Sequence, residues 1–126
     1  MTISKAQKAR LNNIAAVLEN GGDVDGWVQF RSTYRKMNAF SNKKLGVVLK
    51  RPGLILEPRT PSFLCVPTVK LGHGWVLQPI ARKTRLKEAV GRLERKLKKY
   101  RDQGLNPDVH VGNVGWIDDE PLLFDW

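Results

Sequence analysis

The sequence predicts an α+β protein, and three observations lead to that class. Apolar residues recur at helical spacing near the N-terminus and again in residues 84–102. Short runs of strand-forming residues lie between these two helices. Two more short runs follow the second helix and are predicted to form a β-hairpin. The order helix, small sheet, helix, hairpin is typical of the α+β class.

The first helix is predicted over residues 4–19. Ser4 and Gln7 have the spacing of a capping box, in which each side chain bonds the backbone of the other residue. Asn20-Gly21 is a good helix end. The apolar stripe of the helix consists of Leu11, Ile14, Val17 and Leu18.

A small sheet is predicted within residues 27–80. Residues 27–40 fit neither the helical nor the strand period. A strand is predicted over residues 44–50, and residues 63–69 and 75–80 flank Leu-Gly-His-Gly as the strands of a hairpin. We expect this hairpin to pair with the strand at 44–50 in an antiparallel sheet.

Residues 84–102 form the clearest helix, and Gly104 is predicted to end it. We expect its apolar face to pack beneath the small sheet. A final hairpin is predicted from strands at 114–117 and 122–124, turning through residues 118–121. The apolar face of the helix consists of Leu86, Ala89, Val90, Leu93, Leu97 and Tyr100.

Composition predicts a folded chain with one domain, residues 1–126. The chain is 41% hydrophobic, enough for a modest core. Its single cysteine, Cys65, excludes an internal disulfide framework, and its apolar surroundings predict a small buried hydrophobe. No apolar stretch reaches the roughly 18 residues of a membrane span, and no signal-peptide pattern is present. We therefore expect a soluble protein that works in a cytoplasm.

Charge is unevenly distributed along the chain, whose formal net charge is +10. Residues 1–101 hold all 22 Lys and Arg, whereas residues 102–126 hold six acidic residues and no basic one. A basic body suggests phosphate-bearing partners, either a nucleotide or a nucleic acid. An acidic end suits a divalent metal. The alternative is that Lys and Arg only solvate helix faces while the acidic end neutralises them.

Three polar residues near the C-terminus form the most specific motif. Asp108 precedes Asn113 by five residues, in Asp-Val-His-Val-Gly-Asn, and Asp125 follows Asn113 by twelve, with the predicted hairpin between them. Phosphoryl transfer needs such groups: a carboxylate that accepts the proton of the attacking hydroxyl, and an Asn and a second carboxylate that hold Mg²⁺. Between them, His110 is predicted to brace the loop.

This loop resembles the Asp-Leu-His-Pro-Gly-Asn loop of aminoglycoside and choline phosphotransferases and related atypical kinases. Phe124-Asp125-Trp126 resembles the Ile-Asp-Trp or Asp-Phe-Gly element that follows it in those families. The resemblance implies a minimal, truncated protein-kinase-like fold over about residues 44–126, with ATP and Mg²⁺ as cofactors. Asp108 would be the catalytic base, and Asn113 and Asp125 would hold the metal.

The resemblance also implies nucleotide contacts upstream. Val-Val-Leu-Lys50 looks like the strand carrying the phosphate-binding Lys, and the segment that contains Gln78 and Ile80 looks like the strand leading into the hinge that holds adenine. In this reading residues 1–22 form an N-terminal helix, residues 27–80 an N-lobe-like sheet, and residues 84–126 the helix, loop and hairpin. There is no room after Lys50 for the helix whose Glu normally pairs with that Lys, and no glycine-rich phosphate loop is clear.

Three functions remain open, and the sequence does not decide whether the protein is an enzyme. The first is a kinase-like phosphotransferase or ATP-binding protein of the economical kind expected from a bacteriophage, working in the host cytoplasm. The second is an inactive, pseudokinase-like phage protein that binds and modulates a host protein. The third is a basic nucleic-acid-binding protein. Its phosphate contacts would be Arg92, Arg95, Lys96 and Lys99.

Overall fold

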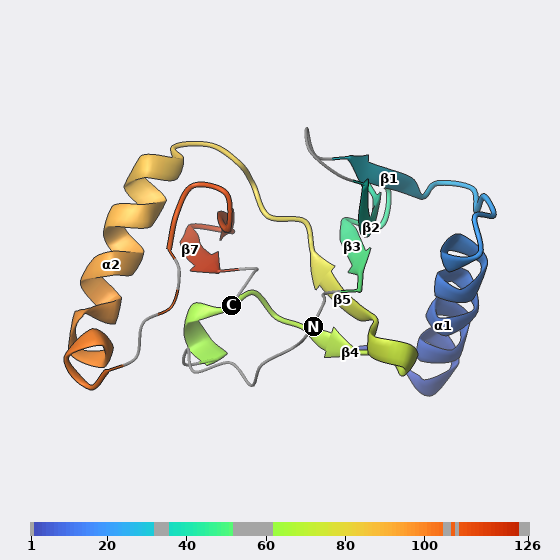
Figure 1. The fold of residues 1–126 in the computed structure, drawn as a ribbon, viewed down its shortest axis with the longest axis horizontal. Coiled ribbons are helices and arrows are strands. Elements are labelled where there is room, and N and C mark those ends of the chain that lie inside the picture. Colours follow the sequence, from blue (N-terminus) through green and yellow to red (C-terminus); the bar gives the residue numbers. More distant parts are fainter. Residues whose placement is uncertain (1, 32–35, 52–61, 105–106, 108, 124–126) are drawn as a thin grey trace. The chain divides into compact units, whose positions relative to one another are not determined.

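The computed structural model describes residues 2–31, 36–51, 62–104, 107 and 109–123. It confirms the α+β class, with two helices, a five-stranded sheet and a two-stranded hairpin in the described residues (Figure 1). Contacts between residues group the chain into two compact units. The first consists of Met1–Leu54 and Pro67–Ile80, and the second of Ile55–Val66 and Ala81–Trp126. That the two units form one kinase-like domain stays a prediction.

The first unit combines one helix with the five-stranded sheet. Helix α1 spans Lys5–Glu19. The strand order is β1-β2-β3-β5-β4, and every neighbouring pair is antiparallel. The strands are β1 (Val28–Arg31), β2 (Lys36–Asn42), β3 (Val47–Lys50), β4 (Val69–Lys70) and β5 (Val76–Pro79).

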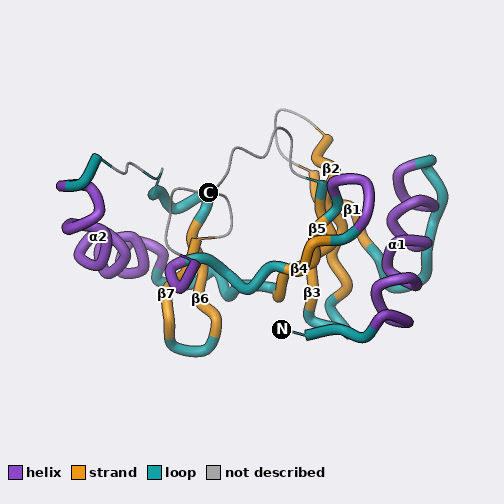
Figure 2. The backbone as a smooth tube through the Cα atoms, turned by 90° about the horizontal axis from the view of Figure 1, so that it is seen from below, coloured by secondary structure: helices purple, strands orange, loops and turns teal. Residues whose placement is uncertain are grey.

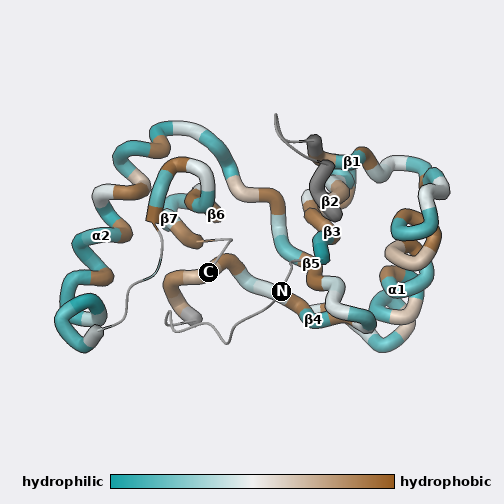
Figure 3. The backbone as a smooth tube through the Cα atoms, in the orientation of Figure 1, coloured by the Kyte–Doolittle hydropathy of each residue, from teal (hydrophilic) through white to brown (hydrophobic). Residues whose placement is uncertain are grey.

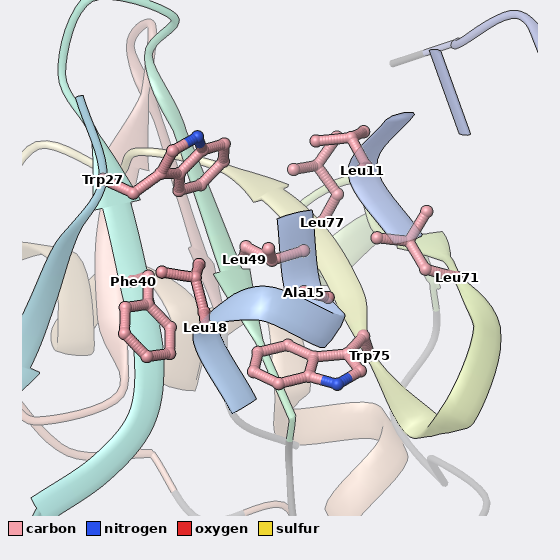
Figure 4. Packing of buried hydrophobic residues seen from close by; sticks show 9 residues of the cluster. All are labelled: Leu11, Ala15, Leu18, Trp27, Phe40, Leu49, Leu71, Trp75 and Leu77. Atoms are coloured by element: carbon pink, nitrogen blue, oxygen red, sulfur yellow. The ribbon is translucent and has the colours of Figure 1, made fainter. Parts of the chain in front are cut away.

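The capping box at the start of α1 is confirmed. The Ser4 hydroxyl oxygen accepts from the Gln7 backbone N–H at 3.1 Å, and Gln7 Oε1 accepts from the Ser4 N–H at 2.8 Å. One detail of the predicted stripe is wrong, because Val17 is 44% exposed. The core is closed by Leu11, Ala15 and Leu18 of α1, which pack against Trp27, Phe40, Leu49, Leu71, Trp75 and Leu77 (Figure 4).

The predicted pairing of β5 with the strand at 44–50 is confirmed, since Leu77 pairs with Leu49. The predicted strand at 63–69 is mostly wrong. Its C-terminal end forms β4, but its beginning contains a 3-10 turn, η1 (Ser62–Leu64). The apolar residues Leu64 and Val66 are buried in the second unit instead, where the Val66 N–H donates to the Leu123 carbonyl at 2.7 Å.

The second unit is built from helix α2 (Leu86–Asp102) and the hairpin of β6 (Val114–Ile117) and β7 (Glu120–Leu123), whose strands run side by side in Figure 2. Hydrophobic and hydrophilic residues alternate along α2 (Figure 3). The expected packing of its apolar face beneath the small sheet is wrong, because its buried partners lie in the hairpin. The core joins Ala89, Leu93 and Leu97 to Leu64, Val114, Trp116 and Leu123.

The hairpin is tighter than predicted. Ile117 pairs with Glu120, so only Asp118 and Asp119 form the loop, and Glu120 and Pro121 belong to the second strand. Asp118 has a φ of 53°, a left-handed conformation that Asp tolerates better than most residues. A short segment pairs with the outer side of β6: the Arg82 N–H donates to the Trp116 carbonyl at 2.8 Å and the Trp116 N–H to the Arg82 carbonyl at 3.0 Å.

Candidate functional site

The loop that ends at Asn113 closes on itself through the Asn113 side chain. Asn113 is 4% exposed. Its Oδ1 accepts from the backbone N–H of His110 at 3.0 Å, and its own backbone N–H donates to the His110 carbonyl at 3.1 Å. Because Asn113 directly precedes β6, these two bonds fix the loop to the start of the hairpin.

His110 adds a third bond to the same loop. Its Nδ1 accepts from the Gly112 backbone N–H at 2.9 Å, which confirms that this residue braces the loop. The imidazole leaves no room for a side chain at position 112, since a Cβ there would lie 2.7 Å from His110 Cε1. Glycine at 112 is therefore part of the loop's construction.

Of the three residues predicted to form the catalytic and metal site, the structure describes Asn113 alone. Asp108 and Asp125 lie outside the described residues. Within the described ranges no three His, Cys, Asp or Glu side chains form a group that could hold a metal ion. The Mg²⁺ site at Asn113 and Asp125 stays a prediction.

The predicted nucleotide contacts Lys50 and Gln78 lie on neighbouring strands of the first unit. Lys50 pairs with Val76 and Gln78 with Val48, so the two residues lie on one face of the sheet at diagonal positions. Leu49 and Leu77 point into the core with α1, so Lys50 and Gln78 lie on the opposite face.

Gln78 is 3% exposed and its Nε2 donates to Thr68 Oγ1 at 2.9 Å. Ile80 is 39% exposed, and its backbone N–H donates to the Gly46 carbonyl at 2.9 Å. Position 80 therefore offers a ligand its side chain rather than its amide hydrogen. Thr68 had no signal in the sequence that tied it to Gln78.

The predicted phosphate contacts lie along one side of α2, and we call Arg92, Arg95, Lys96 and Lys99 the basic row. Arg95, Lys96 and Lys99 are exposed, and Arg92 is half-buried. The Arg92 guanidinium carbon lies 5.3 Å from the ring centroid of Trp116.

Arg85 lies over the same ring, with its guanidinium carbon 5.4 Å from the centroid. The ring itself is fixed, because Trp116 is 2% exposed and its Nε1 donates to the Thr84 carbonyl at 2.6 Å. Cation–π attraction therefore holds two guanidinium groups against the Trp116 ring of β6. Residues 85 and 116 are too far apart in sequence for periodicity to have related them.

Cys65 offers no reactive group at neutral pH. It is buried, as predicted, and burial raises the pKa of its thiol to about 11. The thiolate, which is the nucleophilic form, is therefore scarce below that pH.

Neither helix in the described part of the chain is long and apolar enough to cross a membrane.

No family model, no curated protein and no solved structure matches this chain.

Proposed function

We propose that this chain is a minimal kinase-like protein that binds ATP with Mg²⁺ and transfers the terminal phosphoryl group to a hydroxyl. The observation that carries the proposal is the closed loop at Asn113. A buried amide side chain, fixed by two backbone bonds to His110, stands at the start of a hairpin. Its distance in sequence from Asp108 and Asp125 is the spacing of kinase-type loops.

The hairpin register supports a common location for Asn113 and Asp125. Val114 and Leu123 lie opposite each other in the hairpin. Asn113 directly precedes Val114, and Asp125 follows Leu123 by two positions. Two residues of chain span at most about 7 Å. We therefore assign Asp125 to the same end of the hairpin as Asn113.

The three residues have distinct proposed roles. The Asp108 carboxylate accepts the proton of the substrate hydroxyl. At the same time the hydroxyl oxygen bonds to the terminal phosphorus of ATP, and the bond from that phosphorus to the ADP oxygen breaks. The Asn113 amide oxygen and the Asp125 carboxylate are the oxygen ligands that a hard cation takes. Bound Mg²⁺ would offset the charge of the phosphates.

The proposed nucleotide contacts belong to the sheet of the first unit. Lys50 would offer a positive charge to the phosphates, and it shares a face with Gln78. Because the Gln78 amide is bonded to Thr68 and the Ile80 N–H to Gly46, we assign Gln78 and Ile80 to the walls of an adenine site rather than to its hydrogen-bond donors.

Isothermal titration calorimetry with ATP, with and without Mg²⁺, tests the proposal. The wild type should bind ATP at millimolar concentration or below, more tightly with Mg²⁺. Asp125→Asn should remove the Mg²⁺ dependence, and Asp108→Asn should keep binding but lose transfer. Asp119→Asn, at the exposed hairpin turn, is the matched control and should behave as wild type.

Absence of any ATP binding by the folded wild type would remove the enzyme proposal. The pseudokinase-like protein that binds a host protein would then take its place. If Asp125→Asn binds ATP as well as Asp119→Asn does, nucleotide binding does not depend on the metal site proposed above.

A further inference from the structure

The basic row is a linear array of cations. Arg92, Arg95, Lys96 and Lys99 occupy positions i, i+3, i+4 and i+7 of the helix, so they lie on one side of α2. With a rise of 1.5 Å per residue, Arg92 and Lys99 are about 10 Å apart along the helix axis. Such an array matches the repeated charge of a phosphate backbone.

The basic row is not neutralised within the described part of the chain. There, the ion pairs of α2 join Arg85 to Glu88 at 3.6 Å and Arg101 to Glu94 at 2.8 Å, and neither pair involves the row. Like charges at this spacing destabilise a helix. An anionic partner laid along the row would relieve that repulsion.

An aromatic pair, exposed Phe63 and half-buried Tyr100, adjoins the C-terminal end of the row. Phe63 of η1 is 62% exposed, and its ring centroid lies 6.3 Å from that of Tyr100. Lys99 Nζ lies 5.1 Å from the centre of the Tyr100 ring, and Lys96 precedes Tyr100 by one helical turn. A solvent-exposed ring beside a row of cations is the combination that binds unpaired bases and their phosphates together.

We propose that the basic row and the Phe63–Tyr100 pair form a binding surface for single-stranded nucleic acid. Exposed Phe63 favours single strands, because the faces of bases are stacked on one another inside a duplex. A lipid surface fits less well, since a helix that lies in a membrane interface needs a free apolar face. The apolar residues Leu93 and Leu97 are fully buried against the hairpin.

Fluorescence anisotropy with a labelled oligo-dT of about 20 nucleotides, without ATP or Mg²⁺, tests this surface separately from the nucleotide site. Each phosphate contact with a single strand contributes about 0.7 to the slope of log affinity against log salt. Four contacts should give a slope of about −3, so affinity should fall about fifty-fold between roughly 50 and 200 mM salt. A duplex of the same length should bind more weakly.

Two triple variants separate the row from net charge. Arg92→Glu/Lys96→Glu/Lys99→Glu should abolish oligo-dT binding at about 50 mM salt. Lys5→Glu/Lys8→Glu/Arg10→Glu on α1 reverses three exposed charges of the same sign, so both variants lower the net charge equally, and it should keep most of the binding. Circular dichroism checks that both variants are folded. Equal losses in the two variants would overturn the role of the row.

A single substitution tests stacking. Phe63→Leu keeps an apolar side chain but removes the ring, and should weaken oligo-dT binding by about 5- to 150-fold. Phe30→Leu is the matched control at a ring that is 44% exposed in β1, and should leave affinity unchanged. Unchanged affinity in Phe63→Leu, duplex binding stronger than single-strand binding, or binding to anionic vesicles in place of oligo-dT would each overturn the proposal.

Discussion

The side-chain oxygen of Asn113 accepts a hydrogen bond from the backbone N–H of His110, 3.0 Å away, while the Asn113 N–H donates to the His110 carbonyl. One buried residue thus satisfies both backbone groups of the residue three positions earlier. The two bonds restrain the loop between His110 and Asn113.

Asn113→Ala should therefore destabilise the fold. The change removes the acceptor of the His110 N–H, and the loss of such a hydrogen bond at an exposed residue costs about 0.5–1.5 kcal/mol. Urea unfolding at neutral pH measures it. The matched control is Asn13→Ala, at an exposed position of α1, which should be neutral or slightly stabilising because Ala favours helix. A similar free energy of unfolding for Asn113→Ala and wild type would show that the loop is held by other contacts.

The His110 ring and Gly112 should be coupled. Gly112→Ala forces the imidazole away and breaks its bond with the Gly112 N–H, at a cost of about 1 kcal/mol. In a His110→Ala background the same Gly112→Ala change should cost less, because nothing remains to be displaced. A double-mutant cycle from urea unfolding measures the difference. Strictly additive effects would rule the contact out.

Leu93→Ala should cost about 2–5 kcal/mol, because Leu93 is fully buried between α2 and the hairpin. Leu45→Ala, at a side chain that is 63% exposed, is the matched control and should stay within about 0.5 kcal/mol of wild type. Chemical denaturation compares the two. Equal small effects would show that this face of α2 is not core.

Local sequence patterns predicted where the helices and the final hairpin lie better than they predicted what these elements pack against. The capping box of Ser4 and Gln7, the helix predicted over residues 84–102 and the final hairpin are each encoded within a few neighbouring residues. Each is confirmed, although the helix begins at Leu86. Periodicity also shows which face of α2 is apolar, but not what covers it. That cover comes from the hairpin and from Leu64, which lies more than twenty residues before the helix.

The same limit applies to the candidate site. The bracing of the loop by His110 was predictable because its partners lie within three residues. The contact of Arg85 and Arg92 with Trp116, and that of Phe63 with Tyr100, join residues more than twenty positions apart. Phe63 lay in an apolar run that predicted a strand, so nothing in the sequence marked it as an exposed ring.

Cys65 should make stability fall at high pH. Burial raises the pKa of the folded-state thiol from its ordinary value of 9.0 to about 11. Between these values the unfolded chain loses the proton while the folded chain keeps it, so unfolding is favoured by up to about 1.4 kcal/mol per pH unit. Below pH 9 the effect vanishes.

Cys65→Val removes the thiol while keeping an apolar side chain. The stability difference between this variant and wild type should be constant up to about pH 8 and should shift in favour of the variant near pH 10. Comparing the two proteins cancels the Lys and Tyr titrations that they share. A difference that stays constant across this range would show that the thiol ionises alike in the folded and unfolded chains.

Gly115 of β6 packs closely against Ala81. A Cβ added at Gly115 would lie 2.5 Å from Ala81 Cβ and 3.4 Å from the Arg82 carbonyl oxygen. That segment cannot move away cheaply, because the Arg82 N–H and carbonyl are both bonded to Trp116. Gly115→Ala should therefore cost about 1–3 kcal/mol through overpacking.

Ala81→Gly should relieve the clash in the double variant. Alone, Ala81→Gly should cost no more than about 1 kcal/mol through added backbone freedom. Combined with Gly115→Ala, it makes room for the new methyl group, so the double variant should be more stable than Gly115→Ala alone. Thermal and urea unfolding of the four proteins in the cycle give the coupling free energy. If Ala81→Gly lowers the stability of the Gly115→Ala variant further, Ala81 does not pack against β6. Another contact would then explain the glycine at position 115.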